Sequence, residues 1–325
     1  ERERRMRLVT LFDDVAQEDY RMTILNALKN LQDSNGAFAW YPGMKVRTHV
    51  TQDIVCQMAR LYALTSNEIP MQREMRERGC KFLSQEMARD VKEMRKNGNT
   101  TIGAATMRTL YALALSGYNS QMTDEERQST KHMLSLLKKQ ADGMDREERA
   151  LAAVVLHLYG EDALAKNLME RLHTLINQPD GKHLAYRSDG RTSVSRKTSE
   201  HVQLMEAIRM IEPEDTATLD GMREWLIGMK RTQEWENASQ TADAVYALMA
   251  GCSHFTKGED RLSLQTASKP LVISTPATTL GYVRERMDIS ALPRTLVIDK
   301  KSHGLSYGAV YAQYQTPATC VEAQQ

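Results

Sequence analysis

Residues 31–43 read LQDSNGAFAWYPG, and sequence with helical periodicity lies on both sides of them. The stretch holds a glutamine, Gln32, an Asn-Gly pair that ends at Gly36, and the aromatic residues Phe38 and Trp40. Asn-Gly is typical of a tight turn, because glycine adopts positive φ without steric penalty. The stretch therefore predicts a loop between two helices, with its aromatic residues packed between helical hairpins rather than around a cofactor.

The same order of residues recurs twice further along the chain. Gln178 precedes Gly181 and Tyr186, and Gln233 precedes Trp235. A threonine begins the next predicted helix each time, and its hydroxyl is expected to cap that helix by accepting from free backbone N–H groups. These threonines are Thr51, Thr198 and Thr241. Since α/α toroids commonly cross from one hairpin to the next in this way, the loops favour a closed toroid over an open solenoid.

Residues 1 to about 255 are predicted to form one helix after another, because apolar residues recur three and four positions apart. Each repeat ends in a short cluster around Ala and Leu, and successive clusters lie 49, 45, 50 and 40 residues apart. That spacing suits a pair of helices with its turns. The clusters are Tyr62-Ala63-Leu64, Tyr111-Ala112-Leu113, Leu156-His157-Leu158, Glu206-Ala207-Ile208 and Tyr246-Ala247-Leu248. We therefore expect a mainly α protein, with an α/α toroid of helical hairpins over residues 1–255.

From about residue 262 the period of the apolar residues becomes two, which is typical of β-strands. Prolines divide the alternating segments. The alternating sets are Leu271, Ile273 and Thr275, then Leu296, Ile298 and Lys300, then Ala309, Tyr311 and Gln313. Residues 256–325 are therefore expected to form a small β-sandwich segment that follows the helices.

Charge and composition exclude several classes of protein. The chain of 325 residues has 43 Lys and Arg against 42 Asp and Glu, a formal net charge of +1, so it lacks the basic excess with which proteins bind nucleic acid. No apolar run reaches the roughly 18 residues of a membrane-spanning helix. The four cysteines lie far apart, without the spacing of a structural zinc site. We expect no nucleic-acid partner, no direct membrane span and no cofactor.

Three motifs resemble the α-2-macroglobulin family, in particular its large cell-envelope members in bacteria such as the Bacteroidetes. Residues 31–43, followed by Thr48 and Thr51, are similar to that family's loop of Gln, Asn-Gly, aromatic, Trp and Gly before a Thr-initiated helix. Residues 235–248 are similar to the final toroid helix, and residues 304–314 resemble the β segment beyond it. The three motifs occur in the family's order and span most of the chain.

The resemblance implies that residues 1–255 form most of a thioester-type helical domain and that residues 256–325 form the returning half of a CUB-like β-sandwich. It implies a fragment of a longer, non-catalytic polypeptide that inhibits endopeptidases by conformational trapping after a bait segment is cleaved. The implied partners are other domains of the same polypeptide and the target proteases. The implied location is extracytoplasmic, in the periplasm or associated with the cell envelope.

The family's covalent chemistry needs Cys-x-Glu-Gln, because the cysteine sulfur must reach the side-chain carbonyl carbon of a glutamine three residues on. This sequence lacks that motif. The nearest string, Cys320-Val321-Glu322-Ala323, has alanine at the glutamine position and lies at the opposite end of the expected domain. We therefore assign no thioester residue and no catalytic residue.

Other short motifs favour structural roles. Residues 304–308 read GLSYG, but an alternating pattern follows where the nucleophile elbow of a hydrolase needs a helix, so we expect a β turn or bulge. Asp14 and Asp19 lie five apart rather than one helical turn, which favours a solvated helix face over a magnesium site. His183 and His201 do not form a His-Glu-x-x-His motif and are expected to be solvated or hydrogen-bonded rather than metal ligands.

Two features keep other functions open. A basic segment flanked by Ser and Gly is either a surface loop or an interface for an acidic partner domain. It contains Arg187, Arg191, Arg196 and Lys197. The alternative to an inhibitor is an α/α-toroid glycosidase or lyase acting on polysaccharide, with carboxylates such as Asp180 and Glu200 as general acid and base.

Overall fold

The computed structural model describes residues 14–177, 185–186, 194–232, 237–251, 262–266, 270–271 and 296–300. The chain divides into two compact units, Glu1–Gly251 and Cys252–Gln325. The boundary expected near residue 255 falls in residues 252–261, outside the described residues. The described part of the chain is mainly helical, which confirms the mainly α class.

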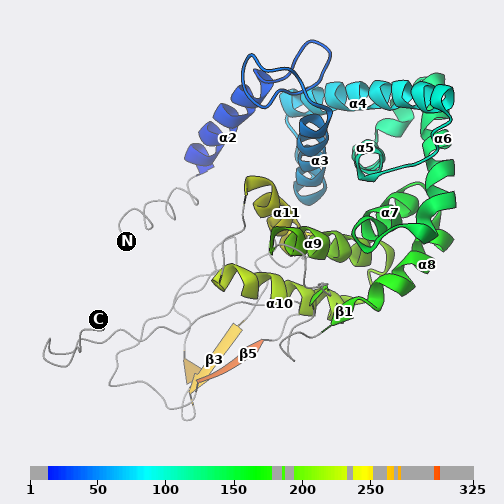
Figure 1. Cartoon of the computed structure of the whole chain (residues 1–325). Coiled ribbons are helices and arrows are strands. Elements are labelled where there is room, and N and C mark those ends of the chain that lie inside the picture. The colour runs from blue at the N-terminus through cyan, green and yellow to red at the C-terminus, as the bar shows by residue number, and fades with distance from the viewer. Residues whose placement is uncertain are drawn as a thin grey trace, which may run out of the picture. The chain divides into compact units, whose positions relative to one another are not determined.

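Ten α-helices lie in the described part of the first unit, numbered α2 to α11 (Figure 1). They are α2 (Asp14–Lys29), α3 (Thr48–Thr65), α4 (Pro70–Asn97), α5 (Ala104–Leu115), α6 (Asp124–Gln140), α7 (Arg146–Leu158), α8 (Asp162–His173), α9 (Val194–Ile211), α10 (Thr216–Thr232) and α11 (Ala238–Met249). Two short 3-10 helices, η1 (Tyr118–Gln121) and η2 (Ala141–Gly143), flank α6. A two-residue antiparallel pair, β1 (Ile176–Asn177) and β2 (Ala185–Tyr186), follows α8. Among the described residues, no helix has the length and apolar character needed to cross a membrane.

Alternate helices of this unit contact one another in sequence. Contacts join α3 to α5, α5 to α7, α7 to α9 and α9 to α11, and α11 contacts α3 again. Four other helices pack on this circuit from outside: α4 on α3 and α5, α6 on α7, α8 on α7 and α9, and α10 on α9 and α11 (Figure 1). The helix α2 contacts α4. The helix α7 shows why it belongs to the inner set. Its residues 152–156 are all buried, as expected of a helix that is covered on every side.

Local chemistry defines the ends of several helices. The hydroxyl of Thr123 accepts from the backbone N–H of Glu126, whose carboxylate accepts from the Thr123 N–H, so α6 begins with a complete capping box. Pro70 is the first residue of α4. Its missing N–H costs no hydrogen bond there, because the first N–H groups of a helix have no partner within the helix. Gly98 ends α4 with a φ of 67°, the left-handed conformation that glycine adopts readily.

The expected threonine caps are wrong, because each helix begins before its threonine. Thr51 lies in the first turn of α3, which begins at Thr48. Thr198 lies inside α9, which begins at Val194. The helix α11 is capped by Asn237, whose side-chain oxygen accepts from the backbone N–H of Gln240 at 2.9 Å. A capping residue must precede the first helical turn to reach its free N–H groups.

The second unit contains a three-stranded antiparallel sheet in its described residues. The strands are β3 (Leu262–Thr266), β4 (Pro270–Leu271) and β5 (Leu296–Lys300), in the order β4-β3-β5. Leu264 of β3 lies opposite Leu271 on one side and Ile298 on the other. Two of the alternating segments of the sequence thus contain strands, and the third, residues 309–313, lies outside the described residues.

Candidate functional site

Gln32 holds the first loop together. Its side-chain amide donates to the carbonyl oxygen of Gly36 at 2.9 Å and to that of Met75 in α4 at 2.8 Å. An isolated antiparallel bridge pairs Gln32 with Phe38. One side chain therefore closes the loop and attaches it to the neighbouring helix. This explains why a glutamine stands at the start of the pattern.

Phe38 is the aromatic residue that fills the space between helices. Its side chain is fully buried, among Leu25 of α2, Val50 of α3 and Met75 of α4. Its backbone N–H donates to the hydroxyl of Thr51 at 2.9 Å. Thr51 thus joins the loop to α3, a different role from the expected helix cap.

Two glycines make this packing possible. Gly36 has a φ of 92°, and a Cβ there would lie 2.3 Å from the carbonyl oxygen of Arg78. Gly79 in α4 was not singled out from the sequence. A Cβ on Gly79 would lie 2.6 Å from Val55 and 3.7 Å from the ring of Phe38. An isolated glycine inside a helical pattern is the signal that could have identified it.

The other predicted aromatic residues differ from Phe38. Trp40 is 57% exposed and meets Tyr41 edge to face, with ring centroids 6.4 Å apart. Trp40 therefore does not pack between the hairpins. Trp235 lies outside the described residues.

A cavity of about 250 Å³ lies where α3, α5, α7, α9 and α11 meet, and all five helices contribute to its lining. Polar side chains line most of it. They include Asp53, Arg60, Arg108, Glu206 and Asp243. The sequence alone gave none of these residues a functional role, although Glu206 begins one of the repeated clusters. Such a cavity at the centre of the inner helices is the main candidate site of the first unit.

Arg60 is the centre of a buried network in this cavity. Its guanidinium donates to Asp243 at 2.6 Å, to Glu206 at 2.8 Å and to the Tyr111 hydroxyl at 2.9 Å. The Tyr111 hydroxyl donates in turn to the other oxygen of Glu206 at 2.5 Å. The guanidinium also lies 4.8 Å from the centroid of the Tyr246 ring, within the range of a cation–π contact. Helices α3, α5, α9 and α11 are thereby joined through one side chain.

The charges of the network are mutually stabilised. Burial alone would lower the pKa of Arg60, but Glu206, Tyr111 and Asp243 raise it well above its ordinary value. Burial and the negative charge of Glu206 likewise raise the pKa of Tyr111. Arg60 therefore stays positively charged and Tyr111 stays neutral. The positive charge of Arg60 offsets the negative charge of Glu206 and Asp243.

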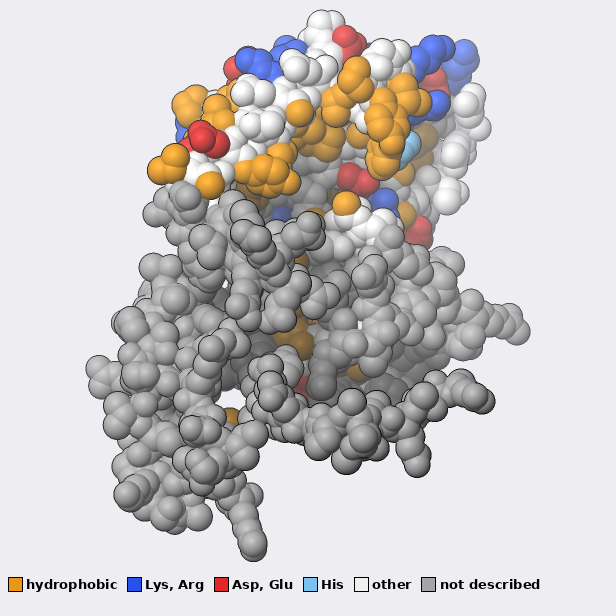
Figure 2. All heavy atoms as spheres, turned by 90° about the vertical axis from the view of Figure 1, so that its left-hand side faces the viewer, with side chains coloured by type: hydrophobic (Ala, Val, Ile, Leu, Met, Phe, Trp, Pro, Cys, Tyr) orange, Lys and Arg blue, Asp and Glu red, His pale blue; other side chains and the backbone are white. Residues whose placement is uncertain are grey.

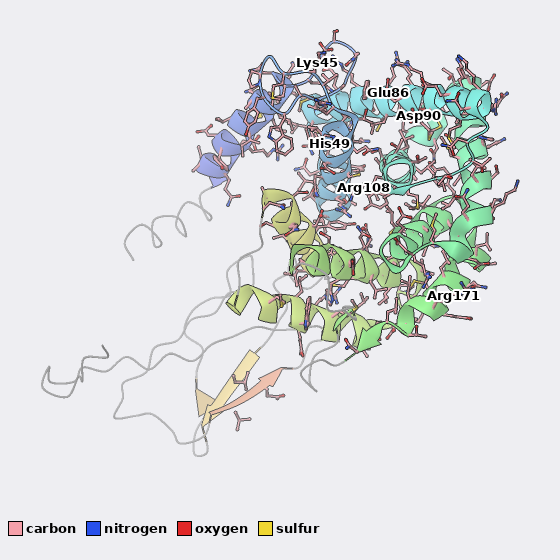
Figure 3. The ribbon with its side chains drawn as sticks, viewed as in Figure 1. Lys45, His49, Glu86, Asp90, Arg108 and Arg171 are labelled. Carbon is pink, nitrogen blue, oxygen red and sulfur yellow. The ribbon has the colours of Figure 1, made fainter. Side chains whose placement is uncertain are left out.

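Asp53 and Cys56 of α3 line the same cavity. Burial raises the pKa of Asp53, with Arg108 acting in the opposite direction, and Arg108 projects from α5 (Figure 3). Burial also raises the pKa of the Cys56 thiol to about 12. A thiol with so high a pKa is protonated at neutral pH and is a poor nucleophile. Asp53 is therefore the better candidate for proton transfer in this cavity.

His201 and Glu200 lie on α9. His201 is fully buried, bonds through Nε2 to the carbonyl oxygen of Met222 at 2.9 Å and lies 4.3 Å from the Trp225 ring, centroid to centroid. Burial lowers the pKa of His201 to about 4, although the bond to Met222 opposes this. Glu200 is 6% exposed. His183 and Asp180, the residues considered beside them in the sequence, lie outside the described residues.

The structure describes only part of the basic segment. Arg187 and Arg191 lie outside the described residues, and Arg196 and Lys197 lie in the first turn of α9 without described side chains. The strings at residues 304–308 and 320–323 also lie outside. Asp19 of α2 is exposed, in line with a solvated helix face.

An exposed apolar surface extends over α2 and the loop that follows it. It contains Val15, Tyr20, Ile24, Trp40, Tyr41 and Met44. Figure 2 shows hydrophobic side chains gathered on this side of the unit. Because soluble monomers rarely expose large apolar surfaces without a binding role, this surface is a candidate interface.

No protein-family model matches this chain, and no curated protein matches it at a significant level.

Proposed function

We propose that this chain is part of an α-2-macroglobulin-like cell-envelope protein, with a non-catalytic role in restraining proteases by conformational trapping. In this proposal the first unit is an α/α toroid of the thioester-domain type, and the second is part of a CUB-like β-sandwich. The protein would act outside the cytoplasm, within a longer polypeptide that also carries the bait segment. The resemblance of three motifs in the family's order is the starting point.

The contacts between helices support the toroid. Five helices contact one another in a circuit that returns from α11 to α3, and the helices between them in sequence lie outside. The loop at residues 31–43 ties α2, α3 and α4 together through Gln32 and Phe38. Both features suit a helical domain that moves as a rigid body when a larger protein rearranges.

The observation that carries a non-catalytic role is the Arg60 network. General acid–base catalysis needs two carboxyl groups whose environments separate their pKa values and leave them free to exchange protons. Here Glu206 and Asp243, at the centre of the inner helices, are both hydrogen-bonded to Arg60. They act as ties between helices instead of as acid and base.

The exposed apolar surface of α2 and its loop suits a contact with another domain of the same polypeptide. Trp40 and Tyr41 give it large side chains with few rotatable bonds, which lose little entropy when they are covered. In this proposal the surface is covered in the intact protein.

The experiment isolates the native polypeptide with an antibody raised against this chain, after separation of envelope from cytosol. We expect a band several times larger than 36.9 kDa in the envelope fraction. The purified polypeptide is then mixed with a protease of broad specificity, which is assayed on a small peptide and on a folded protein substrate. A trapped protease should keep its activity on the peptide and lose it on the protein.

Two results would refute the proposal. One is a cytosolic band near 36.9 kDa, which leaves no room for a bait segment. The other is equal activity of the protease on both substrates in the presence of a large envelope polypeptide. As a control, an unrelated envelope protein is isolated with its own antibody and mixed with the protease in the same way. It shows whether the antibody preparation itself blocks access of the folded substrate to the protease.

Asp53 favours the second candidate, a polysaccharide-acting toroid enzyme. Its carboxyl group lines the central cavity, and burial raises its pKa, as a general acid requires. If this candidate holds, the chain will cleave a member of a panel of polysaccharides, and Asp53→Asn will abolish the cleavage while Cys56→Ser leaves it intact. Absence of cleavage across the panel would leave the inhibitor proposal in first place.

A further inference from the structure

Three helix ends of the first unit bring metal-ligating side chains together, away from the central cavity. His173 is the last residue of α8, Glu212 follows the last residue of α9, and Asp215 precedes the first residue of α10. One ligand atom of each lies within 4.8 Å of the other two, and all three residues are partly buried. The Nε2 atom of His173 and the Oε2 atom of Glu212 are 2.5 Å apart.

We propose that His173, Glu212 and Asp215 bind a first-row divalent metal ion such as Zn²⁺. Nitrogen and oxygen ligands bind zinc at about 2.0 to 2.2 Å, so two ligands of a tetrahedral site lie about 3.3 Å apart. The ligand atoms of His173 and Glu212 lie closer together than that value, at 2.5 Å, and no two of the three ligand atoms are more than 4.8 Å apart. Small movements of these side chains would therefore form the site, with water completing the coordination.

The local charge favours a cation. Within the residues that the structure describes, no Lys or Arg pairs with Glu212 or Asp215. Arg171 lies two residues before His173 and is labelled in Figure 3, but its guanidinium pairs with Asp142. By contrast, Glu206 pairs with Arg60, and Glu68 pairs with Arg76. Two carboxylates and a neutral imidazole around a divalent ion give a site without net charge.

Backbone hydrogen bonds fix the turn that carries Glu212 and Asp215, and one of them holds the Asp215 carboxylate. The N–H of Asp215 donates to the carbonyl oxygen of Glu212 at 3.0 Å, which closes the turn between α9 and α10. Oδ1 of Asp215 accepts from the backbone N–H of Thr218 at 3.2 Å. The carboxylate keeps its second oxygen for a metal ion. Only the His173 side chain and the end of Glu212 must move, so little ordering opposes binding.

A bound ion would join α8 to the turn between α9 and α10, and so connect consecutive hairpins at one end of the unit. It would replace the His173–Glu212 hydrogen bond with three coordination bonds. This role is structural, and it does not depend on the proposed function, because it concerns the stability of the helical unit in any protein that contains it.

The test titrates Zn²⁺ into the full chain after treatment with a chelator, with isothermal titration calorimetry and the melting temperature as readouts. We expect one zinc ion per chain and a higher melting temperature. His173→Ala and Asp215→Asn should each weaken binding about tenfold or more. His157→Ala is the matched control, because His157 contacts only one carboxylate in a comparable pair, Asp162 at 2.7 Å. It should bind zinc like the wild type.

A second measurement keeps the proposal testable if a variant unfolds. X-ray absorption at the zinc edge of the wild-type complex should show imidazole among nitrogen and oxygen ligands at about 2.0 to 2.2 Å. The proposal is overturned if zinc does not bind, if His173→Ala binds it unchanged, or if the absorption spectrum lacks imidazole. Equal stabilisation by Ca²⁺ or Mg²⁺ would also overturn it, since these ions prefer oxygen ligands alone.

Discussion

Acid should destabilise the helical unit through His201, a residue that is buried without charge. Burial lowers its pKa to about 4 from an ordinary value of 6.5, and the bond from its ring to the Met222 carbonyl only partly offsets this. Between these values the unfolded chain binds a proton that the folded chain does not. Stability therefore rises with pH in this window and is lost as the pH falls through it.

The size of the effect follows from the two pKa values. Each unit of difference is equivalent to about 1.4 kcal/mol between the two protonation states. Relative to pH 7, the free energy of unfolding should fall by about 2 kcal/mol at pH 5 and by about 3 kcal/mol at pH 4 from His201 alone. Below pH 4 the folded state also takes up the proton, and the loss levels off.

The assay is urea unfolding followed by far-ultraviolet circular dichroism at several values of pH between 4 and 7, on the wild type and on His201→Gln. Glutamine can still donate to the Met222 carbonyl but does not titrate. The variant should be less stable at pH 7, and the difference from wild type should shrink by about 3 kcal/mol by pH 4. His49→Gln, at an exposed position of α3, is the control and should keep the wild-type dependence.

Parallel loss of stability in the wild type and in His201→Gln would refute this reasoning. It would mean that the imidazole is protonated in the folded state near pH 6, so that the site is more solvated than the structure indicates. A difference that grows as the pH falls would refute it equally.

Three further predictions use the same urea assay. Gly36→Ala should lower the free energy of unfolding by about 3 kcal/mol, because the backbone has a positive φ and the new Cβ would overlap the backbone of Arg78. Gly43→Ala in the same loop should lower it by only about 1 kcal/mol, because the new Cβ meets no atom within 4 Å. Equal losses in the two variants would contradict the overlap at Gly36. Arg60→Met should lower the free energy of unfolding by about 3 to 5 kcal/mol, because the carboxylates of Glu206 and Asp243 lose their partner. Adding Glu206→Gln should restore part of that loss, because it removes one of the unpaired charges. A double variant as unstable as Arg60→Met would contradict this explanation. Thr123→Ala should remove the capping box and lower the free energy of unfolding by about 1 kcal/mol, and an unchanged midpoint would contradict that.

The sequence predicted the local features of the loop at residues 31–43. The pattern contains Gln32, Gly36 and Phe38, and all three act within the loop. Gln32 donates a hydrogen bond to the Gly36 carbonyl oxygen, and Phe38 is buried. The sequence did not distinguish Phe38 from Trp40. Both are aromatic and two residues apart, and the ring that is buried is the one that Leu25, Val50 and Met75 of three different helices surround.

The Arg60 network at the centre of the inner helices, by contrast, could not be predicted from the sequence. Tyr111, Glu206 and Tyr246 each stand first in one of the repeated clusters, so the repeat marked these positions without giving their role. Their meeting point is Arg60, which lies 146 residues from Glu206 and 183 residues from Asp243 along the chain. No periodicity connects positions so far apart.

The sequence by itself determined the class of secondary structure, since periods near 3.6 and of 2 follow directly from the geometry of helices and strands. It also determined the turns, where glycine is the residue that tolerates positive φ. Tertiary structure alone decided which charges are paired and which imidazole is buried. These depend on the side chains that neighbouring helices bring into contact, because burial and distance, rather than residue type, set the energy of a charge.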